Sequence, residues 1–581
     1  MILTNLLSRI FGRAARGNAA NQAAIDACLQ QGYRSQHAAE RAAAERSYRG
    51  ALELDPGNVD AHYLLGALLG ESGNLREAAA HLDQALAARS DFADAHAARG
   101  NVFLLQDNQQ AAVASYEQAI RLAPDHAAAH FNLGLICQRA GRHEEALRYF
   151  ERAYALAPDL PDLLKNLTLL QIEFERFDEA QSGLQRVLQE RPQHYEALKC
   201  LGFVLQKMHR PNQALEHYLK ARALDDRDAE LFNNLGIVLQ DLGRLDEAIA
   251  SYDAAIALKP DFTLAIWHRS LAYLLRHDFA RGWPDYELRL MSADKPHRAV
   301  EYPRWDSAAL AGRRILIYAE QGLGDEIMFA SCLPEVIAAG AHCIVECSPK
   351  LEALFRRSFP AAAVYASTAD QELPQSVREL GVDVQIAMGS LPQYLRASLS
   401  DFPRHRGYLQ AAPERVQYWR ERLAALGSGP KVGISWQGGT HKTRRPVRSI
   451  PLAQWLPILE TAGVHFVDLQ YTECRAEIDA LQAAIGIRVN SWDEARADYE
   501  HTAALVTALD LVISVCTAVI HLGGALGKPV WVMAPFSPEW RYGIAGETMP
   551  WYPSVRLFRQ PSYGAWHPVI AKVAQSLREL A

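Results

Sequence analysis

The chain has 581 residues, of which 49% are hydrophobic and 22% are charged, and this composition is that of a soluble globular protein. Such a length exceeds what one hydrophobic core usually serves, so we expect several domains. The formal net charge of −7 argues against general nucleic-acid binding, which depends on neutralising phosphates. Eight cysteines are scattered without a CxxC pair, which favours a reducing, cytoplasmic location over a disulfide framework or a zinc site.

Residues 1–24 form a predicted amphipathic N-terminal segment that begins "MILTNLLSRIFGRAARG". Its apolar residues recur at helical spacing, with arginines between and after them. One interpretation is a helix packed on its own protein, and the other is weak contact with a membrane surface. No apolar run in the chain approaches the ~18 residues that a membrane span needs.

A repeat of 34 residues runs through a predicted domain of residues 25–294. Three of its columns are glycine at Gly32, Gly66, Gly100, Gly134, Gly202 and Gly236, alanine at Ala44, Ala78, Ala112, Ala146, Ala180, Ala214 and Ala248, and proline at Pro56, Pro124, Pro158, Pro192 and Pro260. This pattern resembles the tetratricopeptide repeat, with seven copies and a degenerate eighth. The resemblance implies an α-solenoid of helix pairs with a concave face.

A candidate acceptor groove on that face is marked by Asn132, Asn166 and Asn234, each two residues before the glycine column. A primary amide offers a donor and an acceptor together, so it can bind a peptide backbone without reading its side chains. The alternative is that these are three solvated polar residues, because other repeats have Gln30, Leu64 and Ala98 at this position.

After a linker at residues 295–312 the pattern changes to short apolar runs separated by helix-length segments. The predicted strands are at 314–320, 342–347, 382–388, 431–438, 465–471, 511–515 and 528–535. This alternation predicts an α/β fold of parallel sheets covered by helices. We expect two Rossmann-like domains, one at 313–410 and one at 411–581.

The turn after the first of these strands reads "GLGDE". Without Cβ atoms, Gly322 and Gly324 let a ligand approach the backbone, although a glycine pair also permits close packing alone. Asp325 begins the following helix, where a carboxylate could be a helix cap or a group that points into the crevice. Ligands of parallel sheets bind in that crevice, beyond the carboxyl ends of the strands.

Further candidate ligand-binding residues follow strands of the second domain: Gly438, Gly439, Thr440, Arg448, Gln470, Glu473, Cys516, Thr517, Ala518 and His521. Thr517 begins a helix whose free N–H groups suit phosphate, and His521 lies on the same face. A buried core histidine is the alternative for His521. Arg448 ends a run of cations that follows one strand, and Gln470 and Glu473 follow the next strand.

The stretches "GLGDEI", "VGISWQGG" and "ALDLVISVCTAVIHLGGALGKPVWVM" resemble the heptosyltransferase-type sugar transferases of glycosyltransferase family nine. The resemblance implies the GT-B fold, in which two Rossmann-like domains face each other across a cleft. It implies an inverting transfer with a nucleotide sugar as co-substrate and no further cofactor. It makes 313–410 the acceptor-side domain and 411–581 the nucleotide-sugar-binding domain. It also makes Asp325 the catalytic base, which takes the proton of the attacking acceptor hydroxyl, and places the candidate ligand-binding residues, Thr517 and His521 among them, at the donor. Arg448 is then the expected partner of the donor's diphosphate, and Gln470 and Glu473 are expected to reach the nucleoside.

Two features qualify this expectation. Many relatives place an acid where this chain has Cys516, so the donor sugar stays open. The second half has no Asp-x-Asp, the usual metal–diphosphate bridge, so we expect metal-independent transfer and no metal ligands. The predicted function is a bacterial-type glycosyltransferase whose repeats recruit a protein acceptor. A lipid or surface-glycan acceptor and an inactive repeat scaffold are the alternatives, and homo-oligomerisation stays open.

Overall fold

The computed structural model describes residues 19–160, 162–291, 300–367, 372–439 and 444–580. The predicted N-terminal segment 1–24 therefore lies mostly outside the described residues. The chain divides into two compact units, Met1–Met208 and His209–Ala581, each with its own core.

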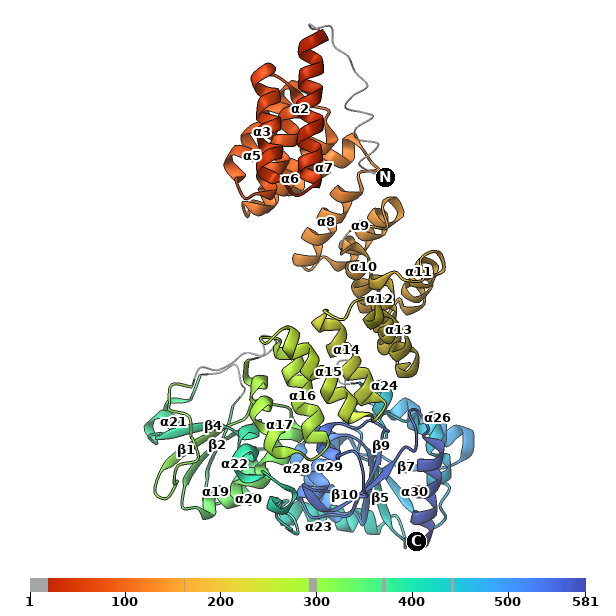
Figure 1. The fold of residues 1–581 in the computed structure, drawn as a ribbon. Coiled ribbons are helices and arrows are strands. Elements are labelled where there is room, and N and C mark those ends of the chain that lie inside the picture. Colours follow the sequence, from red (N-terminus) through yellow and green to blue (C-terminus); the bar gives the residue numbers. More distant parts are fainter. Residues whose placement is uncertain (1–18, 161, 292–299, 368–371, 440–443, 581) are drawn as a thin grey trace. The chain divides into compact units, whose positions relative to one another are not determined.

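The first unit consists of helices that follow one another in pairs (Figure 1). They are α2 (Ala19–His37), α3 (Arg41–Leu54), α4 (Val59–Glu71), α5 (Leu75–Ala88), α6 (Ala93–Leu105), α7 (Gln109–Leu122), α8 (Ala127–Arg139), α9 (His143–Leu156), α10 (Leu163–Glu173), α11 (Phe177–Glu190) and α12 (Tyr195–Lys207).

The glycine column explains how the helices of a pair pack. A Cβ atom at Gly100 would lie 2.6 Å from the ring of Tyr116, and one at Gly134 would lie 2.5 Å from the ring of Phe150. In each of these pairs the aromatic ring of the second helix occupies the space that the glycine of the first helix leaves. Asparagine caps also recur, since the side chain of Asn58 accepts from the backbone N–H of Ala61 at 2.9 Å.

The second unit begins with more helices of the same array: α13 (Pro211–Leu224), α14 (Ala229–Asp241), α15 (Leu245–Leu258), α16 (Thr263–Leu275), α17 (Phe279–Tyr286) and the short 3₁₀ helix η1 (Glu287–Met291). After them the chain forms an α/β region. Its first sheet is parallel, in the order β3-β2-β1-β4, with β1 (Arg314–Tyr318), β2 (His342–Cys347), β3 (Ala363–Ala366) and β4 (Val384–Ala387).

The second sheet has the order β10-β11-β9-β8-β5-β6-β7, and only the β10–β11 pair of the described strands is antiparallel. Its strands are β5 (Lys431–Ser435), β6 (His465–Asp468), β7 (Val489–Asn490), β8 (Leu511–Val515), β9 (Val530–Ala534), β10 (Thr548–Met549) and β11 (Tyr552–Arg559). All seven predicted strands are therefore confirmed, as are the parallel sheets; β3, β7, β10 and β11 were not predicted.

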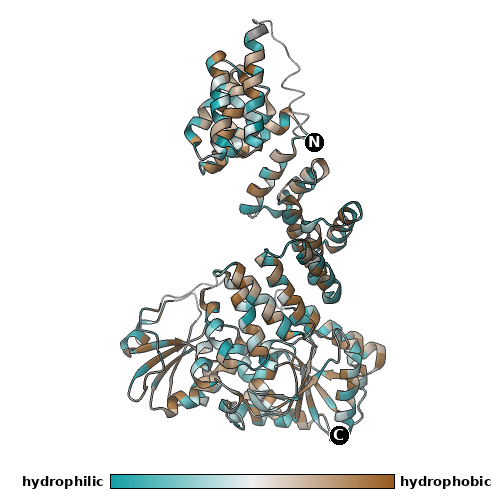
Figure 2. Cartoon of the chain, viewed as in Figure 1, coloured by the Kyte–Doolittle hydropathy of each residue, from teal (hydrophilic) through white to brown (hydrophobic). Residues whose placement is uncertain are grey.

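Helices connect and cover these strands. They are α18 (Leu323–Phe329), α19 (Leu333–Ala338), α20 (Glu352–Ser358), α21 (Gln375–Glu379), α22 (Pro392–Leu395), α23 (Pro413–Ala424), α24 (Arg445–Arg448), α25 (Leu456–Leu459), α26 (Arg475–Ile485), α27 (Asp493–Ala497), α28 (Tyr499–Ala508), α29 (Ala518–Ala525) and α30 (His567–Leu580). Hydrophobic residues gather on the strands, as expected for sheets that helices cover (Figure 2).

The last helix pair belongs to the core of the α/β region. Its residues Leu274, Phe279, Trp283 and Tyr286 lie in one apolar cluster with strand residues of both sheets. The ring of Trp283 lies 5.5 Å from that of Trp540, and its indole N–H donates to the carbonyl of Arg396 at 2.7 Å. The predicted repeat domain 25–294 therefore ends with helices that complete the core of the α/β region.

Candidate functional site

Two helices that come after strands of different sheets meet at the predicted site. Gly324 lies in the first turn of α18, where a Cβ atom would come 3.1 Å from Cδ2 of His521 and 3.4 Å from Cα of Ala518, both on α29. The missing Cβ of this glycine therefore lets α29 pack close to α18, which is the packing role that the sequence left open; its approach to a ligand stays a prediction. Gly322 is the N-cap residue of α18, so the alternative that Asp325 caps this helix is wrong.

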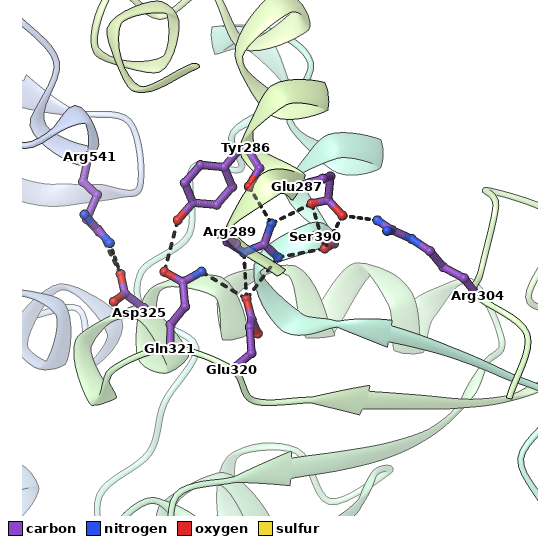
Figure 3. A network of polar contacts seen from close by, with 9 residues as sticks. All are labelled: Tyr286, Glu287, Arg289, Arg304, Glu320, Gln321, Asp325, Ser390 and Arg541. Carbon is purple, nitrogen blue, oxygen red and sulfur yellow. Dashed lines mark hydrogen bonds and ion pairs between the residues drawn. The ribbon is translucent and has the colours of Figure 1, made fainter. Parts of the chain in front are cut away.

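Asp325 is the end of a row of four side chains with alternating charge. Arg541 donates from Nε to Oδ1 of Asp325 at 2.8 Å, and its Nη2 contacts the same oxygen (Figure 3). Its Nη1 lies 3.3 Å from Glu539, which also pairs with Arg448. The row Asp325–Arg541–Glu539–Arg448 thus joins the turn after β1 to the loops after β5 and β9.

Burial opposes the charge of Arg541, but the two carboxylates beside it hold its pKa above the ordinary value. The guanidinium is therefore permanently charged and fixed between its partners. Sequence reasoning missed Arg541 and Glu539. The available signal was their position in "SPEWRYG", directly after a predicted strand and at the same sheet edge as Thr517.

His521 and Thr517 lie beside this row and are both buried. Nδ1 of His521 is 3.1 Å from the hydroxyl of Tyr552, and burial lowers the pKa of His521 to about 3. The imidazole is therefore neutral at physiological pH. Thr517 is the N-cap residue of α29, and its hydroxyl lies 3.1 Å from that of Ser514.

The loop after β5 contacts the loop after β8, which carries Cys516 and Thr517. A Cβ atom at Gly438 would lie 2.6 Å from the carbonyl oxygen of Cys516, so this glycine allows two loops to touch. Gly439 has a left-handed φ of +80°. The thiol of Cys516 is buried, which raises its pKa to about 12, so it is a neutral thiol where many relatives have an acid. Thr440 lies outside the described residues.

Gln470 and Glu473, the residues expected to reach the nucleoside, differ in their surroundings. The amide oxygen of Gln470 accepts from the hydroxyl of Ser435 at 3.1 Å and from the backbone N–H of Trp436 at 3.2 Å, and its nitrogen donates to the carbonyl of Gln437 at 2.8 Å. This amide shapes the loop from within. Glu473 is exposed and pairs with Arg496 at 2.7 Å.

Glu326, the acid next to Asp325, points into the first sheet. It is buried and accepts from the backbone N–H of Ser348 at 2.8 Å. Burial raises its pKa from 4.5 to about 7; the hydrogen bond from Ser348 opposes this rise, and the charges of Glu320 and Glu346 add to it.

This raised pKa predicts how stability depends on pH. The folded state holds the proton of Glu326 more tightly than the unfolded state, so stability falls as the pH rises from about 5 to 7. Glu326→Gln removes this loss. From pH 5 to pH 8 the variant should gain on the order of 2 kcal/mol relative to the natural chain. Urea unfolding at both pH values measures the difference, and an equal difference at both would contradict the buried carboxyl.

The three asparagines of the predicted groove lie in two units, and each is half-buried. In the first unit, Asn132 donates to the side chain of Asn101 at 2.8 Å, and Asn166 donates to the carbonyl of Asp162 at 2.9 Å. In the second unit, Asn234 lies 3.5 Å from the amide nitrogen of Asn233. A cavity of about 460 Å³ lies near Asn166 between α9, α10 and α11 and is lined by Tyr154, Leu164, Leu167 and Leu184 among others.

Comparison with protein families identifies the repeats and the residues that they span. Tetratricopeptide-repeat families match residues 37–102, 93–126, 110–161, 138–200 and 193–261. The first half of the chain is a tetratricopeptide-repeat array. Such repeats commonly bind peptide or protein partners, which gives this part an interaction role.

Individual proteins also resemble the chain. It is 35% identical over 337 residues to Protein FlbA of Caulobacter vibrioides, a match that covers 55% of this chain and 56% of FlbA. The chain thus spans little more than half of that relative. Among solved structures, the chain resembles YrrB, a tetratricopeptide-repeat protein with an unusual peptide-binding site. The two are 23% identical with a TM-score of 0.28, and the match covers 33% of this chain and 98% of YrrB. PilF of Pseudomonas aeruginosa is 22% identical with a TM-score of 0.32, and the match covers 36% of this chain and 96% of PilF.

Two features are absent from the part of the chain that the structure describes. It contains no helix whose length and apolar character would let it cross a membrane. The same residues also contain no group of three or more His, Cys, Asp or Glu side chains arranged to hold a metal ion.

Proposed function

We propose that the α/β region transfers a sugar from a nucleotide-sugar donor to a protein acceptor, and that the repeats bind this acceptor. The single observation that supports this most is the pairing of Asp325 with Arg541, which Glu539 links in turn to Arg448. A carboxylate that follows a strand of one sheet thus lies against a cation that follows a strand of the other, beyond the carboxyl ends of these strands. This is where a donor and an acceptor would both have to lie.

The chemistry assigns each group a role. The acceptor hydroxyl attacks the anomeric carbon, Asp325 takes the hydroxyl proton, and the bond between that carbon and the diphosphate breaks with inversion. Arg448, Arg541 and the start of α29 stabilise the departing diphosphate. The neutral His521 is a hydrogen-bond partner for the donor and adds no charge. Because Arg541 holds Asp325 in the structure, donor phosphate would draw Arg541 away and leave the carboxylate open to the acceptor.

Release of free nucleotide tests this proposal directly. The purified chain is incubated with a panel of nucleotide sugars, and free nucleotide is measured with and without candidate acceptor proteins. We expect slow hydrolysis of one donor and faster release with the true acceptor. If no donor is bound or cleaved, the chain is a repeat scaffold, an alternative that the buried Cys516 and the inward-facing Gln470 favour.

Metal independence is a second expectation, carried by the two arginines and by the lack of Asp-x-Asp in the second half of the sequence. Transfer should proceed at an unchanged rate with EDTA in excess. A loss of activity that Mg²⁺ or Mn²⁺ restores would contradict the proposed stabilisation of the leaving group.

The cellular setting is also part of the proposal. All eight cysteines of the chain lie among the described residues, and all are free thiols. Seven of them are buried. Because this pattern suits a reducing compartment, we propose a cytoplasmic location, where nucleotide sugars are also at hand. If the acceptor is instead a lipid or a surface glycan, adding that molecule should speed the release of nucleotide from the same donor, and adding candidate acceptor proteins should not.

A further inference from the structure

A buried cation lies next to the proposed active site without touching it. Arg289 belongs to η1, directly after the last helix of the repeat array, and its side chain is only 6% exposed. Its guanidinium donates to Glu287 at 2.7 Å, to the carbonyl of Tyr286 at 3.2 Å and to the hydroxyl of Ser390 at 2.8 Å. It also donates from Nε to Oε1 of Glu320 at 3.0 Å (Figure 3).

The last of these contacts reaches the turn that carries Asp325. Three residues separate the end of β1 from Gly322, and they are Ala319, Glu320 and Gln321. Glu320 is held by Arg289, and Gln321 accepts from the hydroxyl of Tyr286 at 3.1 Å. Gln321 also donates to Glu320 at 3.0 Å. Both side chains before the glycine turn are therefore fixed by residues at the end of the repeat array.

A third chain segment closes the cluster. A Cβ atom at Gly389 would lie 2.5 Å from Oε1 of Glu320, 2.6 Å from Nε2 of Gln321 and 3.1 Å from Nη2 of Arg289. The backbone of residue 389 thus packs directly on the side chains of Arg289, Glu320 and Gln321 and confines them from this side. Such confinement from several sides is what holds a turn in one geometry.

The cluster also satisfies its charges. Burial opposes ionisation of Arg289, but Glu320 and Glu287 hold its pKa above the ordinary value. A buried ion pair of this kind adds little net stability over an apolar replacement, yet it strongly disfavours any arrangement that separates its partners. Here the ion pair fixes the position of Glu320. Because Asp325 lies only five positions further along the chain, the ion pair also restricts the position of Asp325.

We propose that Arg289 is a positioning residue that fixes the turn at Gln321–Asp325, so that the end of the repeat array forms part of the proposed active site. The inference rests on the proposed function for its kinetic consequence only; the fixing of the turn is a structural statement. Errors of about 1 Å in the placement of a reacting group cost about 10²-fold in rate, so a loosened turn should be seen in kcat.

The test compares Arg289→Met with a matched control in the full chain. Arg269 on α16 is also paired with two carboxylates, Asp253 and Asp285 at 2.7 Å each, but none of these residues contacts the turn. Arg269→Met therefore controls for loss of a similar ion pair between the preceding helices α15, α16 and α17. Tyr286→Phe removes only the hydrogen bond to Gln321, and it serves if Arg289→Met fails to fold.

Two measurements are made on each variant: hydrogen exchange of the backbone amides at residues 320–329, and kcat and donor KM. We expect faster exchange in this segment for Arg289→Met, less so for Tyr286→Phe and not for Arg269→Met. We also expect kcat to fall about 10-fold or more with donor KM within about 2-fold. Exchange in the turn equal to that of the Arg269→Met control overturns the inference. If the natural chain has no transferase activity, the proposed function fails, and the exchange result still decides whether Arg289 fixes the turn.

Discussion

Asp325→Asn should lower the rate of sugar transfer about 10²-fold or more while donor binding stays nearly unchanged, as loss of a general base does. Asparagine keeps an oxygen that can accept from Arg541, and Glu539 still neutralises that arginine, so the row of side chains should survive. Steady-state kinetics with donor and acceptor, together with donor titration by calorimetry, measure the two quantities separately.

Glu326→Gln is the matched control for this variant. It removes the neighbouring carboxylate and keeps an oxygen for the N–H of Ser348. Because Glu326 points into the first sheet, its replacement should leave kcat within about 3-fold of the natural value, far from the loss expected for a general base. If Asp325→Asn transfers sugar at the natural rate, Asp325 is not the base. If Glu326→Gln alone abolishes transfer, the two acids have exchanged roles.

A chain that starts at residue 209 should still bind donor and hydrolyse it slowly, yet transfer to the true acceptor should fall by about 10²-fold or more. This fragment is the second compact unit, which contains both sheets and the helices α13–α17 that complete their core. Under the proposed function the missing helices α2–α12 recruit the acceptor, and their loss lowers its effective concentration at the site of transfer. Donor hydrolysis and acceptor transfer are measured side by side on the fragment and the full chain.

The place of the cut matters. A chain that starts near residue 300 lacks Trp283, Tyr286 and Arg289, so it should expose core surface and aggregate. If the fragment that starts at residue 209 modifies the acceptor as fast as the full chain does, the first unit serves assembly or localisation instead.

In the full chain, changing Asn132, Asn166 and Asn234 to alanine should raise the acceptor KM and leave donor binding unchanged. A normal acceptor KM would make these asparagines bystanders.

The strands could be predicted where burial is complete. The run "LVISV" became β8, in which every residue is buried, because helices cover both faces of the sheet. β11 was missed because its eight residues mix exposed and buried positions and include Pro553 and Arg556. β3 has only four residues, of which one is buried. Repeat helices were the easiest to predict, since glycines of the column face a large side chain at a fixed distance along the chain.

The site could be predicted only in part, for a related reason. Asp325 and His521 come after the carboxyl ends of strands, and the topology of parallel sheets brings such positions to one edge. The pairing of Asp325 with Arg541 spans 216 residues and depends on how two sheets pack, which no local pattern records. The sequence also does not say which way an amide points, and Gln470 points inward because three polar groups of the β5 loop surround it.

The division of the chain between α12 and α13 has an evolutionary consequence. In a repeat array each helix pair packs chiefly on the next pair, so whole repeats of the first unit could be gained or lost while the second unit keeps its sequence. The pair α16–α17 cannot be exchanged in this way, because Trp283, Tyr286 and Arg289 have partners in that region. Descendants of this chain should therefore differ in the number of repeats at the N-terminal end and share the last pair, so that the reach of the array changes while the chemistry stays the same.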